Sequence, residues 1–373
     1  MTNPSGTRRD EGRKANLGHI SLVTGPIDVR HSFYVRSALQ KRQEPGTLSQ
    51  AHWPARGVPC SAPTPWGEWS RTMATAQLTP VGVGIHNVLI ATDFSRCSTM
   101  ALSFGLELAH GYHASAYVAY VLPAEQYMVV GPDAYEAARD TAHRDLMELR
   151  HELRKKHSYI EGEDYHLFLL EGEVAESILD FARQKEIDVI VVGTHGRGGL
   201  GRALMGSVAE RVFRMSAVPV LTLGPHLQRI ARASSPRNIL VPVDFSPASE
   251  RAAHYAIAMA REHGATLTML HVIEHWPAQA QVDRPRVTQA LREKVEDLLA
   301  EEVRGLRCNV RIEMGRVVET ILYTANGTEA DLVVLGVRPR TGLLNRLMWP
   351  HAYEIVREAA CPVLTVRGEA EER

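Results

Sequence analysis

The stretch of this chain best suited to binding chemistry runs from Gly193 to Ser207 and is rich in glycine. The β-branched run over 188–192 before it predicts a strand buried on both faces, and 207–212 after it begin an amphipathic helix with a serine near its start. A strand, a glycine loop and a helix start together point backbone N–H groups and the positive end of a helix dipole at one spot. The sequence therefore predicts a cradle for an anionic group such as a phosphate.

Two familiar glycine patterns describe this loop poorly. Gly196, Gly198 and Gly201 satisfy the dinucleotide pattern GxGxxG, which is weak evidence taken alone. The glycines follow a late strand instead of the first βα turn, and no acidic residue follows about 20 positions later to hold a ribose. The loop also lacks the Gly-Lys-Ser/Thr of a P-loop. Neither a dehydrogenase nor a P-loop enzyme is favoured.

An internal repeat shows how the elements around this loop are organised. Asn87–Ser95 matches Asn238–Ser246, and Asp188–Gly193 matches Asp331–Gly336. Near the end of each copy, Val218–Thr222 matches Cys361–Thr365. Duplication of a whole domain explains these matches far better than chance.

Each copy alternates short apolar runs with helical periodicity, which is typical of a parallel α/β sheet with helices on both faces. In the first copy we expect strands near 87–92, 115–122, 165–170, 188–193 and 218–223. Residues three or four positions apart predict one apolar helix face per copy, namely Tyr135, Ala138, Ala142, Leu146, Leu149 and Leu153 in the first and Val287, Leu291, Val295 and Leu298 in the second.

The first 84 residues differ from the rest of the chain. Proline, glycine, serine and arginine are frequent there and periodicity is poor, so we expect a disordered or poorly structured extension. A tail that docks on a partner, or translation that starts at Met73, are the alternatives. The predicted organisation is an extension over 1–84, a first domain over 85–224, a linker over 225–236, a second domain over 237–368 and a tail over 369–373.

Composition limits the partners and the compartment. Hydrophobic residues make up 45% of the chain and charged residues 23%, and the net charge of −1 gives no general attraction for nucleic acid or acidic membranes. No apolar run approaches the roughly 18 residues of a membrane span. The four cysteines, Cys60, Cys97, Cys308 and Cys361, are far apart and fit a reducing compartment, so we expect a cytoplasmic protein.

A longer pattern is much more specific. Gly193, two residues, Gly196, nine residues, Gly206 and Ser207 together resemble the ATP-binding signature of the universal stress protein family. The resemblance covers both copies, about 85–368. It implies two tandem, doubly wound, Rossmann-like domains, each with a five-stranded parallel sheet of order 3-2-1-4-5, and a nucleotide in the crevice beside strands 1 and 4.

The resemblance also implies roles for residues of the first copy. Adenine and ribose would contact Ala91, Thr92 and Asp93, the base would lie near Val121, and Val192 with Gly193 would line the other wall. The phosphates would be wrapped by Gly196, Gly206, Ser207 and Val208, and Asp93 could hold Mg²⁺ together with phosphate oxygens. Helix capping is the alternative role for Asp93 and for Ser207. For the charged loop residues His195, Arg197 and Arg202, solvent exposure is the commoner outcome.

The second copy departs from the signature at its phosphate end. Pro339, Trp349 and Pro350 stand where the first copy has Gly196, Gly206 and Ser207. Proline offers no N–H and tryptophan adds bulk, so we expect no triphosphate binding there. Asp244 and Val272 are retained, which leaves open adenosine binding without phosphate contacts, although a purely structural role is favoured.

The sequence shows no motif for catalysis. His151-Glu152 is followed by His157 instead of a histidine at metalloprotease spacing, and no GxSxG occurs. We therefore expect a non-enzymatic, ATP-binding stress-response regulator, with weak ATP hydrolysis left open. A slow ATPase or nucleotidyl-transferring enzyme, and a scaffold without nucleotide, are the alternatives. The family resemblance further implies pairing of Val218–Leu223 with Val363–Val366 within the chain, and a homodimer is possible.

Overall fold

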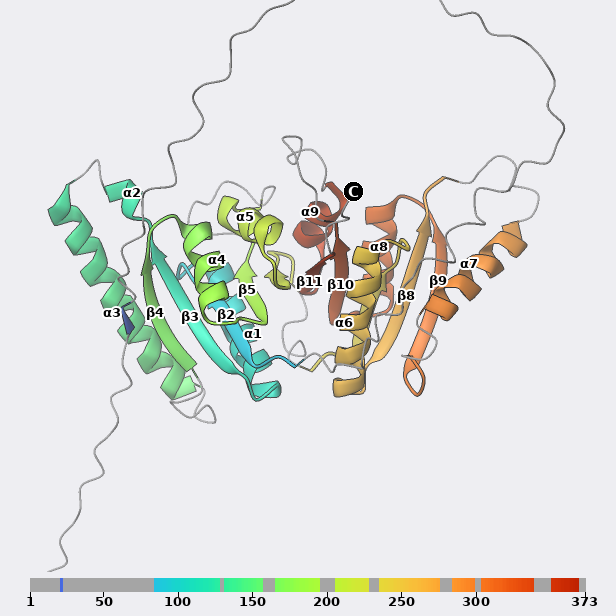
Figure 1. Ribbon diagram of the computed structural model, residues 1–373, viewed down its shortest axis with the longest axis horizontal. Coiled ribbons are helices and arrows are strands. Elements are labelled where there is room, and N and C mark those ends of the chain that lie inside the picture. Colours follow the sequence, from blue (N-terminus) through green and yellow to red (C-terminus); the bar gives the residue numbers. More distant parts are fainter. Residues whose placement is uncertain are drawn as a thin grey trace, which may run out of the picture. The chain divides into compact units, whose positions relative to one another are not determined.

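A computed structural model describes residues 21–22, 84–127, 131–156, 165–194, 205–227, 235–275, 284–298, 303–338 and 350–368. Within these ranges the chain alternates strands and helices along both copies of the repeat (Figure 1). The predicted linker and extension lie largely outside the described residues.

The first half begins each strand close to where the apolar runs predict it. Its strands are β2 (Asn87–Ala91), β3 (Ser115–Leu122), β4 (Tyr165–Glu171), β5 (Val189–Gly193) and β6 (Val220–Leu223). Its helices are α1 (Arg96–Gly111), α2 (Ala124–Tyr127), α3 (Pro132–Lys156), α4 (Val174–Gln184) and α5 (Ser207–Met215).

The second half repeats this order with one helix fewer among the described residues. Its strands are β7 (Asn238–Pro242), β8 (Thr266–Ile273), β9 (Arg307–Met314), β10 (Leu332–Val337) and β11 (Val363–Arg367). Its helices are α6 (Pro247–His263), α7 (Arg284–Leu298), α8 (Val317–Gly327) and α9 (Pro350–Glu358).

All described strands belong to one sheet of order β1-β4-β3-β2-β5-β6-β11-β10-β7-β8-β9. Counted from β2 and from β7, each half has the strand order 3-2-1-4-5. Neighbouring strands are parallel within each half, and among the described strands only the contact between β6 and β11 is antiparallel. The predicted α/β fold of two tandem doubly wound units is confirmed.

Helices cover both faces of the sheet (Figure 1). On one face, α1 and α6 bury side chains such as Phe104 and Met259. On the other face, α4, α5, α8 and α9 bury Ile178, Val212, Ile321 and Ile355. The face predicted on the first long helix is found on α3, where Ala142, Leu146 and Leu153 are buried; on α7, Val295 is buried and Val287 and Leu291 are half-buried.

The predicted extension contributes one described element, which the sequence did not indicate. β1 (Ser21–Leu22) pairs in parallel with Phe168 and Leu169 of β4, at the edge of the sheet. A two-residue strand carries no periodicity that a sequence pattern could reveal.

An equivalent aspartate in each half fixes the start of the central strand. Asp188 accepts hydrogen bonds from the backbone N–H groups of His86 and Asn87, at 2.7 and 2.8 Å. Asp331 accepts the equivalent bonds from Arg237 and Asn238, at 2.9 and 3.1 Å. Asp188 and Asp331 thus have a structural role where the strands begin, at the opposite end of the sheet from the carboxyl ends of the strands.

The two halves are joined through β6 and β11, as the resemblance implies. Leu221 lies opposite Leu364, with Thr222 opposite Val363 on one side and Val220 opposite Thr365 on the other. The hydroxyl of Thr222 donates to the carbonyl of Val363, and that of Thr365 donates to the carbonyl of Val220, both at 3.0 Å. The joint therefore has local two-fold symmetry, although its halves differ in sequence.

A second pair of equivalent residues meets across this joint. The hydroxyl of Tyr112, at the end of α1, lies 3.0 Å from Nε2 of His263, the last residue of α6. The two rings meet edge to face with centroids 5.3 Å apart. Burial lowers the pKa of His263 below its usual value, against the opposing charge of Glu262, so the folded protein favours the neutral imidazole.

We expect Thr222→Val and Thr365→Val each to lower the free energy of unfolding by about 1 kcal/mol, because each leaves a buried carbonyl without its hydroxyl donor. Valine keeps the side-chain shape, and both threonines are at most 2% exposed. Denaturant unfolding measures the effect. Thr99→Val is the control, since Thr99 is exposed and water replaces its hydroxyl. Equal unfolding midpoints for all three variants would contradict the assignment.

His263 should make stability depend on pH. Its lowered pKa means that the unfolded chain binds the proton more readily, so its contribution is complete above the usual pKa of 6.5 and is lost as the pH falls. Between about pH 7.5 and about pH 5.5, wild-type protein should therefore lose more stability than His263→Gln. The exposed His110 supplies the matched variant, His110→Gln. Parallel stability curves for wild type and His263→Gln would show that the site does not titrate differently on folding.

Candidate functional site

The candidate site lies where β2 and β5 end, side by side in the middle of the first half. The chain leaves β2 toward β3 on one side and reaches β6 from β5 on the other, so the direction of winding reverses between them. In open α/β sheets, ligands bind beyond the carboxyl ends of strands at such a reversal. We call this place the first crevice, and its equivalent between β7 and β10 the second crevice.

The turn from β2 into α1 forms one wall of the first crevice. The N–H of Thr92 donates to the carbonyl of Ala119 at 2.9 Å, which extends the pairing of β2 with β3 by one residue. The carboxylate of Asp93 accepts from the N–H of Ser95 at 3.0 Å. Ser95, not Asp93, is the N-cap of α1, because its hydroxyl accepts from the N–H of Ser98. The capping alternative for Asp93 is therefore wrong, and its carboxylate stands half-buried at the strand end.

The backbone of this turn is strained. Phe94 has a φ of +60°, in the left-handed region that side chains other than glycine rarely occupy. Phe245, its equivalent in the second half, has the same φ. Since both halves share the strain, it belongs to the fold of the repeat and is no evidence for a ligand in one crevice.

Gly193 ends β5 against the first turn of α1, and the contact leaves no room for a side chain. A Cβ at Gly193 would lie 2.8 Å from the carbonyl carbon of Cys97 and 2.9 Å from its oxygen. At Gly336 a Cβ would lie 2.3 Å from the oxygen of Ala248. Close packing of strand on helix thus explains why this glycine of the signature is present in both halves.

The other wall follows β5. The N–H and the hydroxyl of Thr194 both donate to the carbonyl of Leu223, at 3.0 and 3.1 Å. The carbonyl of Thr194 accepts from the N–H of Gly206 at 2.6 Å, so the two ends of the glycine loop meet. Four residues predicted at or near the site lie outside the described residues, namely His195, Gly196, Arg197 and Arg202.

Helix α5 begins at the first crevice without a side-chain cap. Its N-cap is Gly206, and Ser207 is its first helical residue, so the alternative of Ser207 as the cap is wrong. The first backbone N–H groups of an α-helix have no partner within the helix, and at Gly206 no side chain accepts from them. Together with the helix dipole, the N–H groups that begin with Ser207 and Val208 favour an anionic acceptor.

Apolar core residues lie beneath the first crevice. Four residues predicted at the site, Ala91, Val121, Val192 and Val208, belong to one apolar cluster on the face that carries α4 and α5. Val121 and Val192 are almost fully buried, whereas Ala91 and Val208 are only partly buried. Of the predicted apolar contacts, Ala91 and Val208 therefore keep exposed area.

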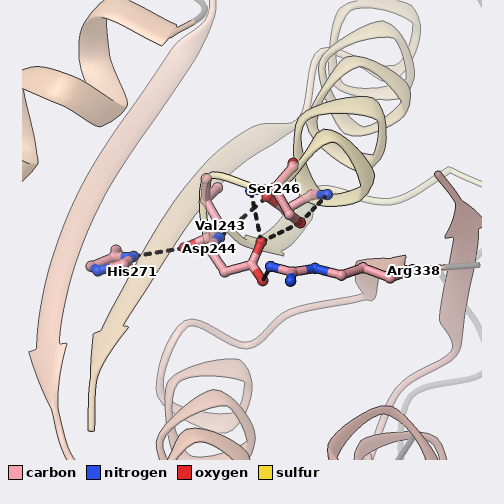
Figure 2. Close-up of polar contacts among 6 residues, drawn as sticks. Val243, Asp244, Ser246, His271 and Arg338 are labelled. Atoms are coloured by element: carbon pink, nitrogen blue, oxygen red, sulfur yellow. Dashed lines mark hydrogen bonds and ion pairs between the residues drawn. The ribbon is translucent and has the colours of Figure 1, made fainter. Parts of the chain in front are cut away.

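At the second crevice an arginine of the same half pairs with the aspartate, and both side chains are exposed. Nη2 of Arg338, just beyond β10, donates to Oδ2 of Asp244 at 2.8 Å, and Ser246 donates to Oδ1 (Figure 2). Desolvation opposes ionisation of Asp244, but hydrogen bonds from Ser246 and Ser249 and the charge of Arg338 outweigh it and hold its pKa below its usual value. Asp244 therefore already has a cationic partner.

The residues retained in the second half, Asp244 and Val272, lie among contacts within the fold. The carbonyl of Val243, beside Asp244, lies 2.8 Å from Nδ1 of His271 (Figure 2). The His271 ring packs against Phe245 with centroids 4.8 Å apart. Val272 packs on the apolar cluster of the sheet. Pro339 and Trp349 lie outside the described residues, whereas Pro350 begins α9.

Sequence reasoning missed two residues at these crevices. Arg338 closely follows the matched run Asp331–Gly336. A charged residue just beyond a predicted strand end could therefore have indicated a side chain at the crevice. Tyr353 of α9 reaches from the second half to the first, where its hydroxyl accepts from the N–H of Met205 at 2.8 Å. No local pattern indicates this contact, because it joins residues 148 positions apart.

The described residues contain no group of three or more His, Cys, Asp or Glu side chains that could hold a metal ion. No helix in the same ranges is long and apolar enough to span a membrane.

Comparisons with known proteins agree with the geometry. A family model described as "Universal stress protein family" matches residues 84–223 and 236–367. A universal stress protein of Mycolicibacterium smegmatis is 30% identical over 204 residues, which cover 52% of this chain and 66% of that protein. A universal stress protein of Mycobacterium tuberculosis is 24% identical over 326 residues, covering 79% of this chain and 97% of that protein.

Among solved structures, a universal stress protein from Archaeoglobus fulgidus matches with a TM-score of 0.61 at 22% identity, over 78% of this chain and 99% of that one. At this identity the likeness concerns the fold. The matches of the family model to both halves are what decide the classification: this chain belongs to the universal stress protein family and contains two tandem copies of its domain.

Proposed function

We propose that the first half binds ATP in the first crevice, and that the protein acts in the cytoplasm as a non-enzymatic regulator of the stress response. The observation that carries this proposal is that two neighbouring strands end together: Asp93 follows β2, and Thr194, whose carbonyl accepts from Gly206 at the uncapped start of α5, follows β5. One end of the crevice suits hydroxyl donors and the other suits anions.

Each part of ATP has a matching group among these residues. The partly buried Ala91 can offer apolar contact to the adenine ring, with Val121 and Val192 buried in the same apolar cluster. The Asp93 carboxylate can accept hydrogen bonds from ribose hydroxyls. The N–H groups at the start of α5 and the Ser207 hydroxyl suit phosphate oxygens. Gly196 would add a backbone donor, and Asp93 is the residue we propose for Mg²⁺ carried in with the phosphates.

The second half is proposed not to bind a triphosphate. Pro350, at the start of α9, has no N–H where Ser207 offers one in the first half. Arg338 already pairs with Asp244, the carboxylate that corresponds to Asp93. Both observations favour one nucleotide per chain.

A slow ATPase or nucleotidyl-transferring enzyme that uses the same crevice is the alternative. Hydrolysis would need a positioned water molecule and strong stabilisation of charge on the transferred phosphoryl group. Incubation of the pure protein with ATP, followed by product analysis, separates the two readings. Mass spectrometry of ligand carried through purification identifies the nucleotide and its stoichiometry, and protein that binds no nucleotide would favour a scaffold.

The duplication supplies a matched pair of variants for the site. Asp93→Ala should raise the Kd for ATP at least about tenfold, because it removes a charged acceptor from the crevice. Asp244→Ala makes the same change in the second half and should leave the Kd unchanged. Isothermal titration calorimetry measures both. Equal effects of the two variants would contradict the assignment of ATP to the first half.

The phosphate end can be tested by giving the first half the residue that the second half has at the equivalent position, Trp349. Gly206→Trp should abolish ATP binding, because the indole would fill the space in front of the α5 amides. Gly327→Trp is the control, since a Cβ at this exposed residue at the end of α8 meets nothing within 4 Å. ATP affinity preserved in Gly206→Trp would mean that the phosphates do not lie at α5.

A further inference from the structure

The second half touches the main chain of the first crevice through Tyr353. We propose that Tyr353 is a positioning residue for the nucleotide site of the first half. In this role the second half structurally supports ATP binding in the first half. This inference rests on the proposed function and adds to it a residue from outside the signature.

The contact fixes one peptide group at the edge of the site. The hydroxyl of Tyr353 accepts from the N–H of Met205 at 2.8 Å. Met205 immediately precedes Gly206, the N-cap of α5, and is only 5% exposed. A hydrogen bond in such a buried place is specific, because an unpaired N–H there would be costly.

Two successive amides are held by two different parts of the chain. The N–H of Met205 points to Tyr353 of the second half, and the N–H of Gly206 points to the carbonyl of Thr194 in the first half. With both amides fixed, the direction in which the chain enters α5 is fixed as well. The amides that follow, from Ser207 onward, are the ones proposed to bind phosphate.

Packing holds Tyr353 against the first half. Met205 and Tyr353 belong to the same apolar cluster, together with Ile355 and Val356 of α9. At the end of β6, a Cβ on Gly224 would lie 3.1 Å from the carbonyl oxygen of Val356, so α9 also lies close to the first half there. The pairing of β6 with β11 sets the position of α9. In this position the hydroxyl of Tyr353 reaches the N–H of Met205.

The tyrosine is present in the second half and not in the first. When the halves are aligned, position 353 corresponds to Glu210 of α5, and the residue equivalent to Met205, Met348, lies outside the described residues. The Glu210 carboxylate lies 3.4 Å from Arg214 on its own helix, an ordinary i,i+4 ion pair. The tyrosine is therefore found in the half whose signature is degenerate, and it contacts the half whose signature is intact.

The first readout needs no nucleotide. In ¹⁵N-labelled protein, Tyr353→Phe should speed hydrogen exchange of the Met205 amide about tenfold, because the amide loses its acceptor while the ring stays in place. Tyr323→Phe is the matched control, since Tyr323 lies on α8 of the same half and is 79% exposed. Unchanged exchange at Met205 in Tyr353→Phe would overturn the inference at its first step.

The second readout compares two ligands by calorimetry. Tyr353→Phe should raise the Kd for ATP about three- to tenfold, the range expected for one hydrogen bond, and should leave the Kd for adenosine unchanged. A loss that affected both ligands equally would indicate general damage to the first half and would also overturn the inference. Tyr323→Phe should leave both constants unchanged.

Failure of the inference and failure of the proposed function are distinguishable. If wild-type protein does not bind ATP, the proposed function falls and the positioning role falls with it. If wild type binds ATP and Tyr353→Phe binds it equally well, only the positioning role falls. Faster exchange at Met205 together with a selective loss of ATP affinity is the result that supports the inference.

Discussion

The antiparallel contact between β6 and β11 is the interaction on which the rest of the structure depends. Each half alone would expose the edge of a nearly apolar strand, which favours pairing with another strand. Pairing the two edges makes one continuous sheet and buries Thr222 and Thr365 as reciprocal donors. It also brings α9 against the chain that leads into α5, so the supporting contact of Tyr353 follows from the joint.

The duplication separates features of the fold from features of a site. The strained Phe94 and Phe245, and the glycines Gly193 and Gly336 packed against a helix, occur in both halves and serve the fold. In the first half α5 starts at Gly206 without a side-chain cap, and in the second half Arg338 pairs with Asp244. The sequence differs at both places, because Trp349 is equivalent to Gly206 and His195 to Arg338, and both Trp349 and His195 lie outside the described ranges. The candidate site is accordingly defined by where the sequences of the halves differ.

Most of the fold could be predicted from the sequence, because apolar runs and the repeat report directly on strands and their duplication. The pairing of Val218–Leu223 with Val363–Val366 was implied by family resemblance, and the two strands pair over Val220–Thr222 and Val363–Thr365. Contacts between distant residues could not be predicted in this way. The choice of Ser95 over Asp93 as helix cap depends on local backbone geometry, and Tyr353 depends on how two folded halves meet.

Joining both halves in one chain has a consequence for how the joint evolves and operates. In an assembly of two identical subunits, any substitution at the interface appears on both sides, so a support at one site must also alter the other. Within a single chain, position 353 can be tyrosine while position 210 remains glutamate. Intramolecular association is also independent of dilution. The contact of Tyr353 with the chain that leads into α5 therefore persists at low cellular abundance, when separate subunits would dissociate.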